Sequence, residues 1–327
     1  MNYAPVIIPT LNRYEHFVNC LESLEKCTGH EHTIVYVALD YPPSPKYEEG
    51  WKKISSYLDK KEKDHSFKEL IVVRRDHNYG ICCENSNDME LIHNTIFKHY
   101  DRYIETEDDN IFSPNFLEYM NVCLDKFQND DRVDVVCGYA HETIISESYH
   151  NNYVLTKNGS PWGIGKWRDK VLKHDKYYNV DYIKELIRKK DIRKIVFERN
   201  PIIVDAVVAM VKMGEVHGDG CMGLYHAIED LFTVVPTVSK VRNYGNDGSG
   251  VHCPRPSDKD QYFRSRPIDE DTHFEMTNDV FVTDDHYISV IPKKNRITLR
   301  RIIRQLRVWF DRYCFIWFGV VPKNKYL

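Results

Sequence analysis

Apolar residues in the first 130 positions form two alternating kinds of segment. Continuous apolar runs, typical of strands buried on both faces, alternate with segments in which apolar residues recur at helical spacing. These patterns predict strands at 4–10, 33–39, 70–73 and from Tyr103 onwards, and helices at 14–28, 47–58, 89–96 and 116–127. Strands that alternate with helices indicate parallel βαβ units, so we expect an α/β fold with a mostly parallel sheet flanked by helices.

The pattern becomes less regular after residue 132. Strands are predicted at 133–139 and 234–241, and helices at about 181–190 and 201–213. Two further segments are rich in glycine and predict loops, at 214–223 and 243–258. We expect one large domain with two halves and a tail, at about 1–130, 131–292 and 293–327.

Composition changes this picture mainly through charge. Hydrophobic residues make up 42% of the 327 and charged residues 29%, which is typical of a globular chain. The formal net charge is -4, yet the tail 293–327 holds ten Lys or Arg and one acid, Asp311. The remaining body is therefore acidic, which argues against nucleic acid as a partner and indicates that the tail has a partner of its own.

Cysteine usage and the start of the chain bear on location. The nine cysteines are odd in number and include no C-x-x-C pair, which favours reduced thiols. A strand is predicted almost directly after Met1, no secretory signal is evident, and no apolar run is long enough to span a bilayer. We expect a cytoplasmic protein.

Carboxylates follow two of the predicted strands. Asp40 ends the second strand, and Glu107, Asp108 and Asp109 follow the fourth. In parallel sheets, ligands bind beyond the carboxyl ends of the strands, so these side chains are candidates for a site. Three consecutive acids at a buried strand end are costly unless paired, which favours a hard divalent cation, Mn²⁺ or Mg²⁺. The alternative is that they only precede a helix and favour its dipole.

Four segments together resemble a known enzyme class. The chain is similar to glycosyltransferases of the GT-A, Rossmann-like fold in these segments: APVIIPTLNR, a strand ending in Asp40, HNYGICCEN and YIETEDDNIFSPNFLEYM. The opening and the Asn-x-Gly turn resemble family 2 enzymes. The chain resembles the N-acetylglucosaminyltransferase I family in its Glu-Asp-Asp and the following Pro-x-Phe-x-x-Tyr. A weaker resemblance to that family continues in VVPTVSKVRNYGNDGSGVH. The matched segments lie between residues 4 and 252.

The resemblance implies a metal-dependent transfer of a sugar from a nucleotide-sugar, a UDP-sugar by preference, to a glycan or lipid-linked acceptor. The half at 1–130 would bind the nucleotide and the half at 131–292 the acceptor. Asp109 would bind Mn²⁺ or Mg²⁺, with His252 as a further metal candidate. The donor would contact residues of the strand ends and the turn: Pro9, Thr10, Asp40, Asn78, Gly80, Glu107 and Asp108.

A catalytic base is expected upstream of the late Pro-x-Val-Ser segment. Asp219 lies at the corresponding place, 17 residues before Pro236, and would deprotonate the acceptor hydroxyl during an inverting displacement. Its neighbours are glycines, where the family has Trp and Asp. Glu229 and Asp230 therefore remain rivals, and a plain turn role for Asp219 stays open.

Two aromatic features have both a functional and a structural interpretation. Trp162 and Trp167 bracket a Gly-rich hexapeptide that either stacks on an acceptor sugar or packs as a loop. In the tail, arginines at helical spacing precede the apolar run Tyr313–Val321. This pattern predicts either a basic, aromatic helix in peripheral contact with a membrane or a helix docked on the domain.

Two other functions remain open at this stage. A sugar-nucleotide nucleotidyltransferase shares a related fold, but its first loop is Gly-rich, whereas Thr10–Arg13 contains no glycine. A non-catalytic nucleotide-sugar-binding protein would keep the pocket and tolerate loss of the base.

Overall fold

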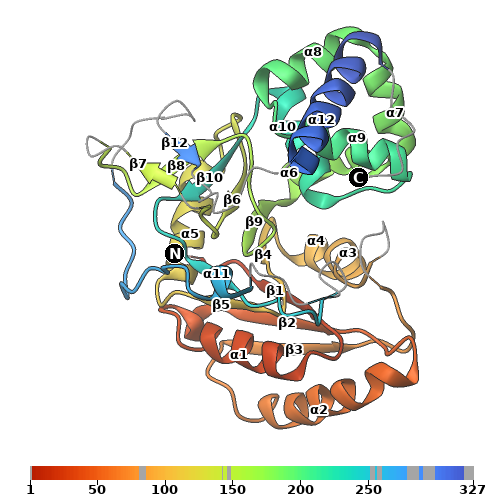
Figure 1. Ribbon diagram of the computed structural model, residues 1–327. Coiled ribbons are helices and arrows are strands. Elements are labelled where there is room, and N and C mark those ends of the chain that lie inside the picture. Colours follow the sequence, from red (N-terminus) through yellow and green to blue (C-terminus); the bar gives the residue numbers. More distant parts are fainter. Residues whose placement is uncertain are drawn as a thin grey trace.

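The computed structural model describes residues 2–80, 86–141, 143–145, 149–250, 255, 260–277, 287–289 and 299–319. An eight-stranded mixed sheet runs through the molecule (Figure 1) in the order β3-β2-β1-β4-β9-β6-β10-β8. The strands are β1 (Val6–Thr10), β2 (Ile34–Leu39), β3 (Glu69–Arg74), β4 (Arg102–Glu105), β6 (Val133–Cys137), β8 (Tyr153–Thr156), β9 (Ile164–Trp167) and β10 (Phe232–Pro236). The four strands at one end, β3-β2-β1-β4, are all parallel, which confirms the predicted α/β class.

Alternate side chains of β1 enter two different cores. Val6 and Ile8 pack on α1 (Tyr14–Leu24), α2 (Pro45–Lys61) and α5 (Phe116–Phe127), whereas Ile7 belongs to a second cluster. That cluster lies beneath α3 (Asn87–Leu91), the π-helical turn η2 (Ile92–Ile96), α4 (Phe97–His99) and α6 (Arg168–His174). Because both faces of the strand are buried, its apolar run is continuous.

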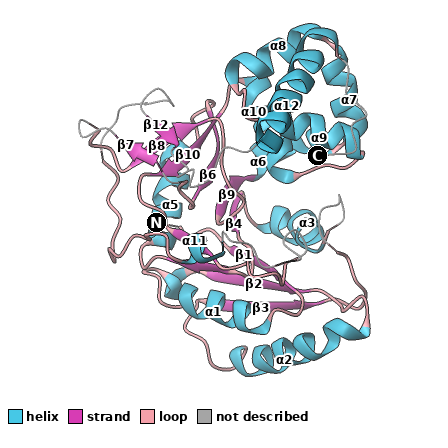
Figure 2. Ribbon diagram, in the orientation of Figure 1, coloured by secondary structure: helices cyan, strands magenta, loops and turns pink. Residues whose placement is uncertain are grey.

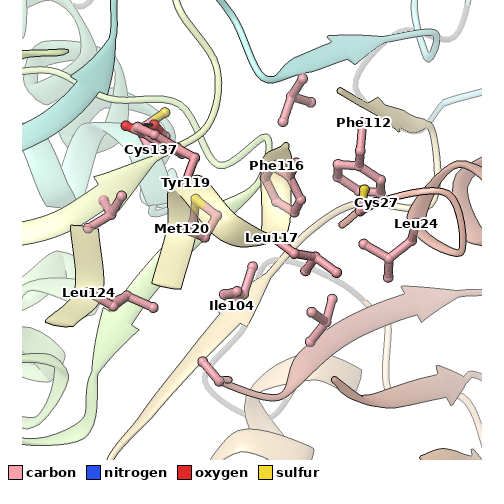
Figure 3. Close-up of a cluster of buried hydrophobic side chains, with 14 of the residues drawn as sticks. Leu24, Cys27, Ile104, Phe112, Phe116, Leu117, Tyr119, Met120, Leu124 and Cys137 are labelled. Carbon is pink, nitrogen blue, oxygen red and sulfur yellow. Dashed lines mark hydrogen bonds between the residues drawn. The ribbon is translucent and has the colours of Figure 1, made fainter. Parts of the chain in front are cut away.

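Helix α5 supplies much of the first core. Figure 3 shows Phe116, Leu117, Met120 and Leu124 along one side of this helix, facing Ile104 of β4. Their spacing of three and four residues places them on one helical face, as the sequence pattern predicts. The packing fixes β4 in the sheet, and β4 leads directly into the acidic triplet.

The Gly- and Trp-rich segment forms a central strand, which the sequence did not predict. β9 runs antiparallel between β4 and β6. A side chain at Gly165 would lie 3.1 Å from Met120 and 3.2 Å from Leu124, so glycine lets α5 approach the sheet closely. Trp167 is only 2% exposed, and its Nε1 donates to the Leu124 carbonyl at 3.3 Å. The prediction that Trp167 contacts an acceptor is therefore wrong, because its ring is enclosed in the core.

A helical lobe stands apart from α1 and α2 at the other end of the molecule (Figure 2). It contains the 3-10 turn η3 (Asp175–Tyr178), α7 (Val180–Arg188), α8 (Lys190–Arg199), α9 (Val204–Met213), α10 (Gly218–Glu229) and the C-terminal α12 (Leu299–Phe318). The predicted helices at 181–190 and 201–213 correspond to α7 and α9. The predicted basic tail helix is α12, and it docks on α8 and α9.

Smaller elements complete the described part of the chain. Two two-stranded sheets pair β5 (Asn110–Phe112) with β11 (Val241–Asn243), and β7 (Thr143–Ile145) with β12 (Tyr287–Ser289). The strand predicted at 234–241 is thus two strands, β10 and β11. Short helices lie at η1 (His30–His32) and α11 (Asp260–Arg264). Within the described residues, no helix has the length and apolar character needed to cross a membrane.

Candidate functional site

The order of the parallel strands reverses at β1. From β1 the chain moves outward to β2 and β3, then returns to place β4 on the opposite side of β1. In open α/β sheets, such a reversal of strand order is where ligands bind, beyond the carboxyl ends of the strands. Thr10 ends β1, and the triplet Glu107–Asp109 follows β4, so both predicted features meet at this point.

An arginine links the two aspartates of the triplet. Arg13 donates from Nη1 to Asp109 Oδ2 at 2.7 Å and from Nη2 to Asp108 Oδ1. Thr10 Oγ1 donates to the other Asp108 oxygen at 2.8 Å, and Asn243 Nδ2 donates to Asp109 Oδ1 at 2.7 Å. Each carboxylate oxygen of this pair therefore accepts a hydrogen bond. Arg13 and Asn243 were not among the predicted site residues.

The triplet carries more negative charge than Arg13 neutralises. Burial raises the pKa of Glu107 well above its ordinary value, and the neighbouring aspartates raise it further against the opposing effect of Arg13. Burial also raises the pKa of Asp108, although Arg13 and Thr10 act in the opposite direction. Burial disfavours the charged form of Arg13, but the two aspartates outweigh this effect and raise its pKa. A further cation beside the triplet would oppose these rises in pKa and favour the ionised forms of the acids.

The late glycine-rich loop closes over the same aspartates. Tyr244 N donates to the Asp109 carbonyl at 2.9 Å, and a Cβ at Gly245 would lie only 2.0 Å from Asp109 Oδ2. Only glycine fits at such a distance. Further along, Asp247 accepts from His16 of α1 at 2.9 Å, which anchors the loop at the start of that helix. The predicted metal candidate His252 lies outside the described residues.

The residues around Asp108 and Asp109 fit a hard divalent cation of the Mg²⁺ type. Such ions are held by one or two carboxylates, and phosphate oxygens of a substrate and water complete the shell. Among the residues that can be described, no three His, Cys, Asp or Glu side chains form a self-sufficient metal cluster. Since Arg13 contacts one oxygen of each aspartate, a cation shared by the pair would compete with the guanidinium for those oxygens.

Asp40 holds a turn rather than offering free acceptors. Its Oδ1 accepts from the backbone N–H groups of Tyr41 and Tyr79, both at 2.9 Å. Its Oδ2 accepts from Asn78 Nδ2 and from Gly80 N, again at 2.9 Å. A carboxylate has about four acceptor positions. The predicted contact between Asp40 and a base therefore needs correction, because Tyr41 N and three donors of the turn at 78–80 occupy all four positions.

A surface pocket of about 320 Å³ lies just beyond β2. Its walls include aromatic, proline and polar side chains: Tyr41, Pro42, Ser44, Pro45, Glu48, Trp51 and Lys52. The Nε1 atom of Trp51 is buried without a hydrogen-bond partner. Gly50, next to Trp51 in α2, packs against the loop before Arg13, since its Cβ would lie 2.0 Å from the Asn12 carbonyl oxygen. The pocket and the carboxylates are thus neighbours along one edge of the sheet.

Of the three base candidates, Asp219 is the one whose charge acts on the triplet through Glu107. It is exposed in the first turn of α10, and its charge contributes to the raised pKa of Glu107. Glu229 and Asp230 lie at the other end of the helix, about 15 Å away at 1.5 Å per residue. There Glu229 accepts from Tyr177 Oη at 3.2 Å, and Asp230 pairs with Lys157 at 2.6 Å.

The remaining predicted residues have simpler surroundings. Pro9 is half-buried and pairs in register with Ala38 of β2. Trp162 is half-buried and makes edge contacts with Tyr139 and Phe263, at ring-centre distances of 4.7 Å and 5.4 Å. Trp162 therefore keeps part of its ring accessible, in contrast to Trp167.

No family model matches the sequence, and no curated protein does. Among solved structures, residues 1–349 of S. aureus TarS align with a TM-score of 0.36 and 17% identity, over 52% of this chain and 48% of that one. The TarS complex with UDP aligns with a TM-score of 0.37 and 16% identity, over 57% and 55%. The mannosyltransferase PcManGT from Pyrobaculum calidifontis, in complex with GDP-Man and Mn²⁺, gives 0.32 and 14%, over 52% and 46%.

The chain thus spans about half the length of these solved structures. At TM-scores this low, the alignments do not decide what the chain does. The link to the N-acetylglucosaminyltransferase I family stays a prediction. The function is therefore argued from the chain's own residues.

Proposed function

We propose that this protein is a metal-dependent glycosyltransferase that moves a sugar from a nucleotide-sugar, a UDP-sugar by preference, to a glycan or lipid-linked acceptor. The observation that carries the proposal is the pair Asp108 and Asp109, bridged by Arg13 at the point where the strand order reverses. A buried acidic pair at this position suits a cation and the diphosphate it accompanies. The exposed Asp219, whose charge acts on Glu107, supplies a base for the acceptor.

In this proposal, Asp109 and Asp108 hold Mn²⁺ or Mg²⁺. A divalent cation held there would supply positive charge for the diphosphate leaving group. Arg13, released from the aspartates, forms paired hydrogen bonds with phosphate oxygens, for which its planar fork is suited. The pocket lined by Tyr41 and Trp51 receives the nucleoside.

Asp219 then acts on the acceptor. Its carboxylate takes the hydroxyl proton while the acceptor oxygen bonds to the anomeric carbon. The bond from that carbon to the diphosphate oxygen breaks, and the electron pair leaves with the diphosphate. A single carboxylate and direct displacement invert the anomeric centre. The half-buried Trp162 is the aromatic side chain that would stack on the acceptor sugar.

The test is a panel of nucleotide-sugars incubated with purified protein and Mn²⁺, with release of the nucleoside diphosphate as the readout. We expect turnover with at least one donor, loss of turnover in EDTA, and no metal-dependent UDP binding by calorimetry in Asp109→Asn. Asp181→Asn is the matched control, since Asp181 is exposed on α7 and its one ion pair among the described residues is with Lys184.

Two outcomes separate the alternatives. UDP binding without turnover for any donor would favour a non-catalytic binding protein. Release of pyrophosphate from a nucleoside triphosphate and a sugar phosphate would favour a nucleotidyltransferase. Unchanged UDP affinity in Asp109→Asn would refute the metal-ligand role.

A further inference from the structure

The C-terminal helix α12 presents an apolar stripe to solvent. The exposed residues recur at three- and four-residue spacing and define the α12 patch: Leu299, Ile302, Ile303, Leu306, Trp309, Phe310, Tyr313, Trp317 and Phe318. These are nine of the fifteen large apolar side chains that are exposed in the described part of the chain. Trp309 is 65% exposed and stacks on Tyr313 at 5.8 Å. Soluble monomers rarely leave so large a contiguous apolar surface uncovered unless it binds something.

The opposite face of α12 fixes the helix on the lobe. Phe315 and Ile316 are buried in the core of the helical lobe. Arg193 of α8 donates from Nε to the Ile316 carbonyl at 3.1 Å, and Lys212 of α9 pairs with Asp311 at 3.2 Å. Figure 1 shows α12 lying along α8 and α9. The stripe therefore points outward because its inner face is already occupied.

Unpaired positive charge surrounds the patch. The Nζ atoms of Lys190 and Lys194 lie 5.7 and 5.8 Å from the centre of the Trp317 ring. Arg307 is exposed on the helix itself. None of the three forms an ion pair with a described residue. The only acid of the helix, Asp311, is paired with Lys212, so the surface that the patch offers is apolar and cationic.

We propose that the α12 patch binds the surface of an anionic lipid bilayer, with the helix lying in the plane of the interface. Tryptophan and tyrosine favour the boundary between headgroups and acyl chains, and lysine and arginine pair with anionic headgroups. The helix is 20 residues, or about 30 Å, long, but its inner face and arginines exclude a spanning orientation. The proposal goes beyond the sugar transfer and does not depend on it.

A second copy of the chain is the main rival occupant. In a two-fold dimer, each patch faces the same patch of the partner, so Lys190, Lys194 and Arg307 of both copies come together. Like charges at close range oppose that contact, whereas an anionic bilayer supplies the missing counter-charge. The charge distribution therefore favours lipid.

The test is flotation of the full chain with vesicles, without donor or metal. One set of vesicles is phosphatidylcholine alone, and the other also contains phosphatidylglycerol. We expect binding to the anionic vesicles only, weakening as salt rises. Trp309→Glu should lower the affinity about tenfold or more, because it places a charge in the apolar stripe. Val238→Glu is the matched control: Val238 is also exposed, lies outside α12, and should leave binding unchanged.

A second variant tests the charge separately and does not alter α12. Lys190→Gln combined with Lys194→Gln should weaken binding to anionic vesicles several-fold and reduce its salt dependence. Failure of the full chain to float with anionic vesicles would overturn the proposal, as would equal binding by Trp309→Glu and Val238→Glu. A dimer in sedimentation velocity that Trp309→Glu dissociates would assign the patch to a second copy instead. Because no donor is present, these outcomes are independent of those for sugar transfer.

Discussion

The carboxyl end of β4 and the outer face of α12 both depart from the usual rule that charged side chains are exposed and large apolar ones are buried. At β4, acids are buried: Asp108 and Asp109 are each 5% exposed. At α12, large apolar groups such as Trp309 are exposed. Buried charges and large exposed apolar surfaces both cost stability unless something covers or pairs them. The first region has an internal partner, Arg13, for its two aspartates. The second has none among the described residues.

The strongest test of the β4 region concerns its base. Asp219→Asn should keep donor binding and lose turnover by about 10²–10⁴-fold, the usual contribution of a general base. The matched variant Glu229→Gln, at the far end of the same helix, should turn over normally. Steady-state rates with calorimetric donor affinities check both. If Glu229→Gln loses activity and Asp219→Asn does not, the chemistry lies at the other end of α10.

Removing Arg13 should leave the carboxylates after β4 without a charged partner, just as the apolar face of α12 has no partner among the described residues. Arg13→Gln leaves two buried carboxylates without their cation, so we expect a loss of about 3–5 kcal/mol in the free energy of unfolding in EDTA. Saturating Mn²⁺ should restore part of this loss, about 2.7 kcal/mol at a hundredfold excess over Kd. Urea unfolding with and without Mn²⁺ measures both quantities.

The control for this experiment is Arg74→Gln. Arg74 pairs with Asp59 and Glu62 at the surface, where such pairs contribute about 0–1 kcal/mol. Its stability should barely change and should not respond to Mn²⁺. An Arg13→Gln protein as stable as the parent in EDTA would show that Arg13 is not the counter-charge of the triplet.

The smallest expected effect concerns how α12 is held. Arg312 donates two hydrogen bonds to Asp205 of α9, but both side chains are partly exposed. Arg312→Ala should therefore cost only about 0.2–1 kcal/mol, measured by urea unfolding. Packing of Phe315 and Ile316 remains as the main anchor. A loss of several kcal/mol would mean that the ion pair, rather than apolar burial, fixes the helix.

Sequence patterns predicted the parallel half well because each of its strands is a local, continuous apolar run. Once the strands are parallel, their carboxyl ends lie at one edge of the sheet, so Asp40 and the triplet were expected at that edge. The sequence could not predict that the turn at 78–80 donates hydrogen bonds to Asp40, since the two are far apart along the chain. Arg13 had a usable signal: a buried acidic pair needs a cation, and Arg13 stands in the loop directly after β1.

The second half was predicted less well for a physical reason. β9 is only four residues long and includes Gly165, and it becomes a strand through pairing with β4 and β6. In α10, glycines at 218, 220 and 223 obscure the helical spacing. Asp219 was consequently expected in a turn or loop, whereas it lies in the first turn of a helix. For α12, the sequence left docking and membrane contact as alternatives. The structure shows docking on one face and leaves the other face open to solvent.

The position of β9 has a practical consequence for anyone who wishes to express residues 1–130 alone. A fragment ending near residue 130 would lack β9, and β4 would become a free edge with unpaired backbone groups. Such edges recruit strands from other molecules, so the fragment should aggregate. β9 joins β4 to β6 in the sheet, although it lies later in the chain than both. A soluble N-terminal fragment would therefore have to extend at least through Trp167.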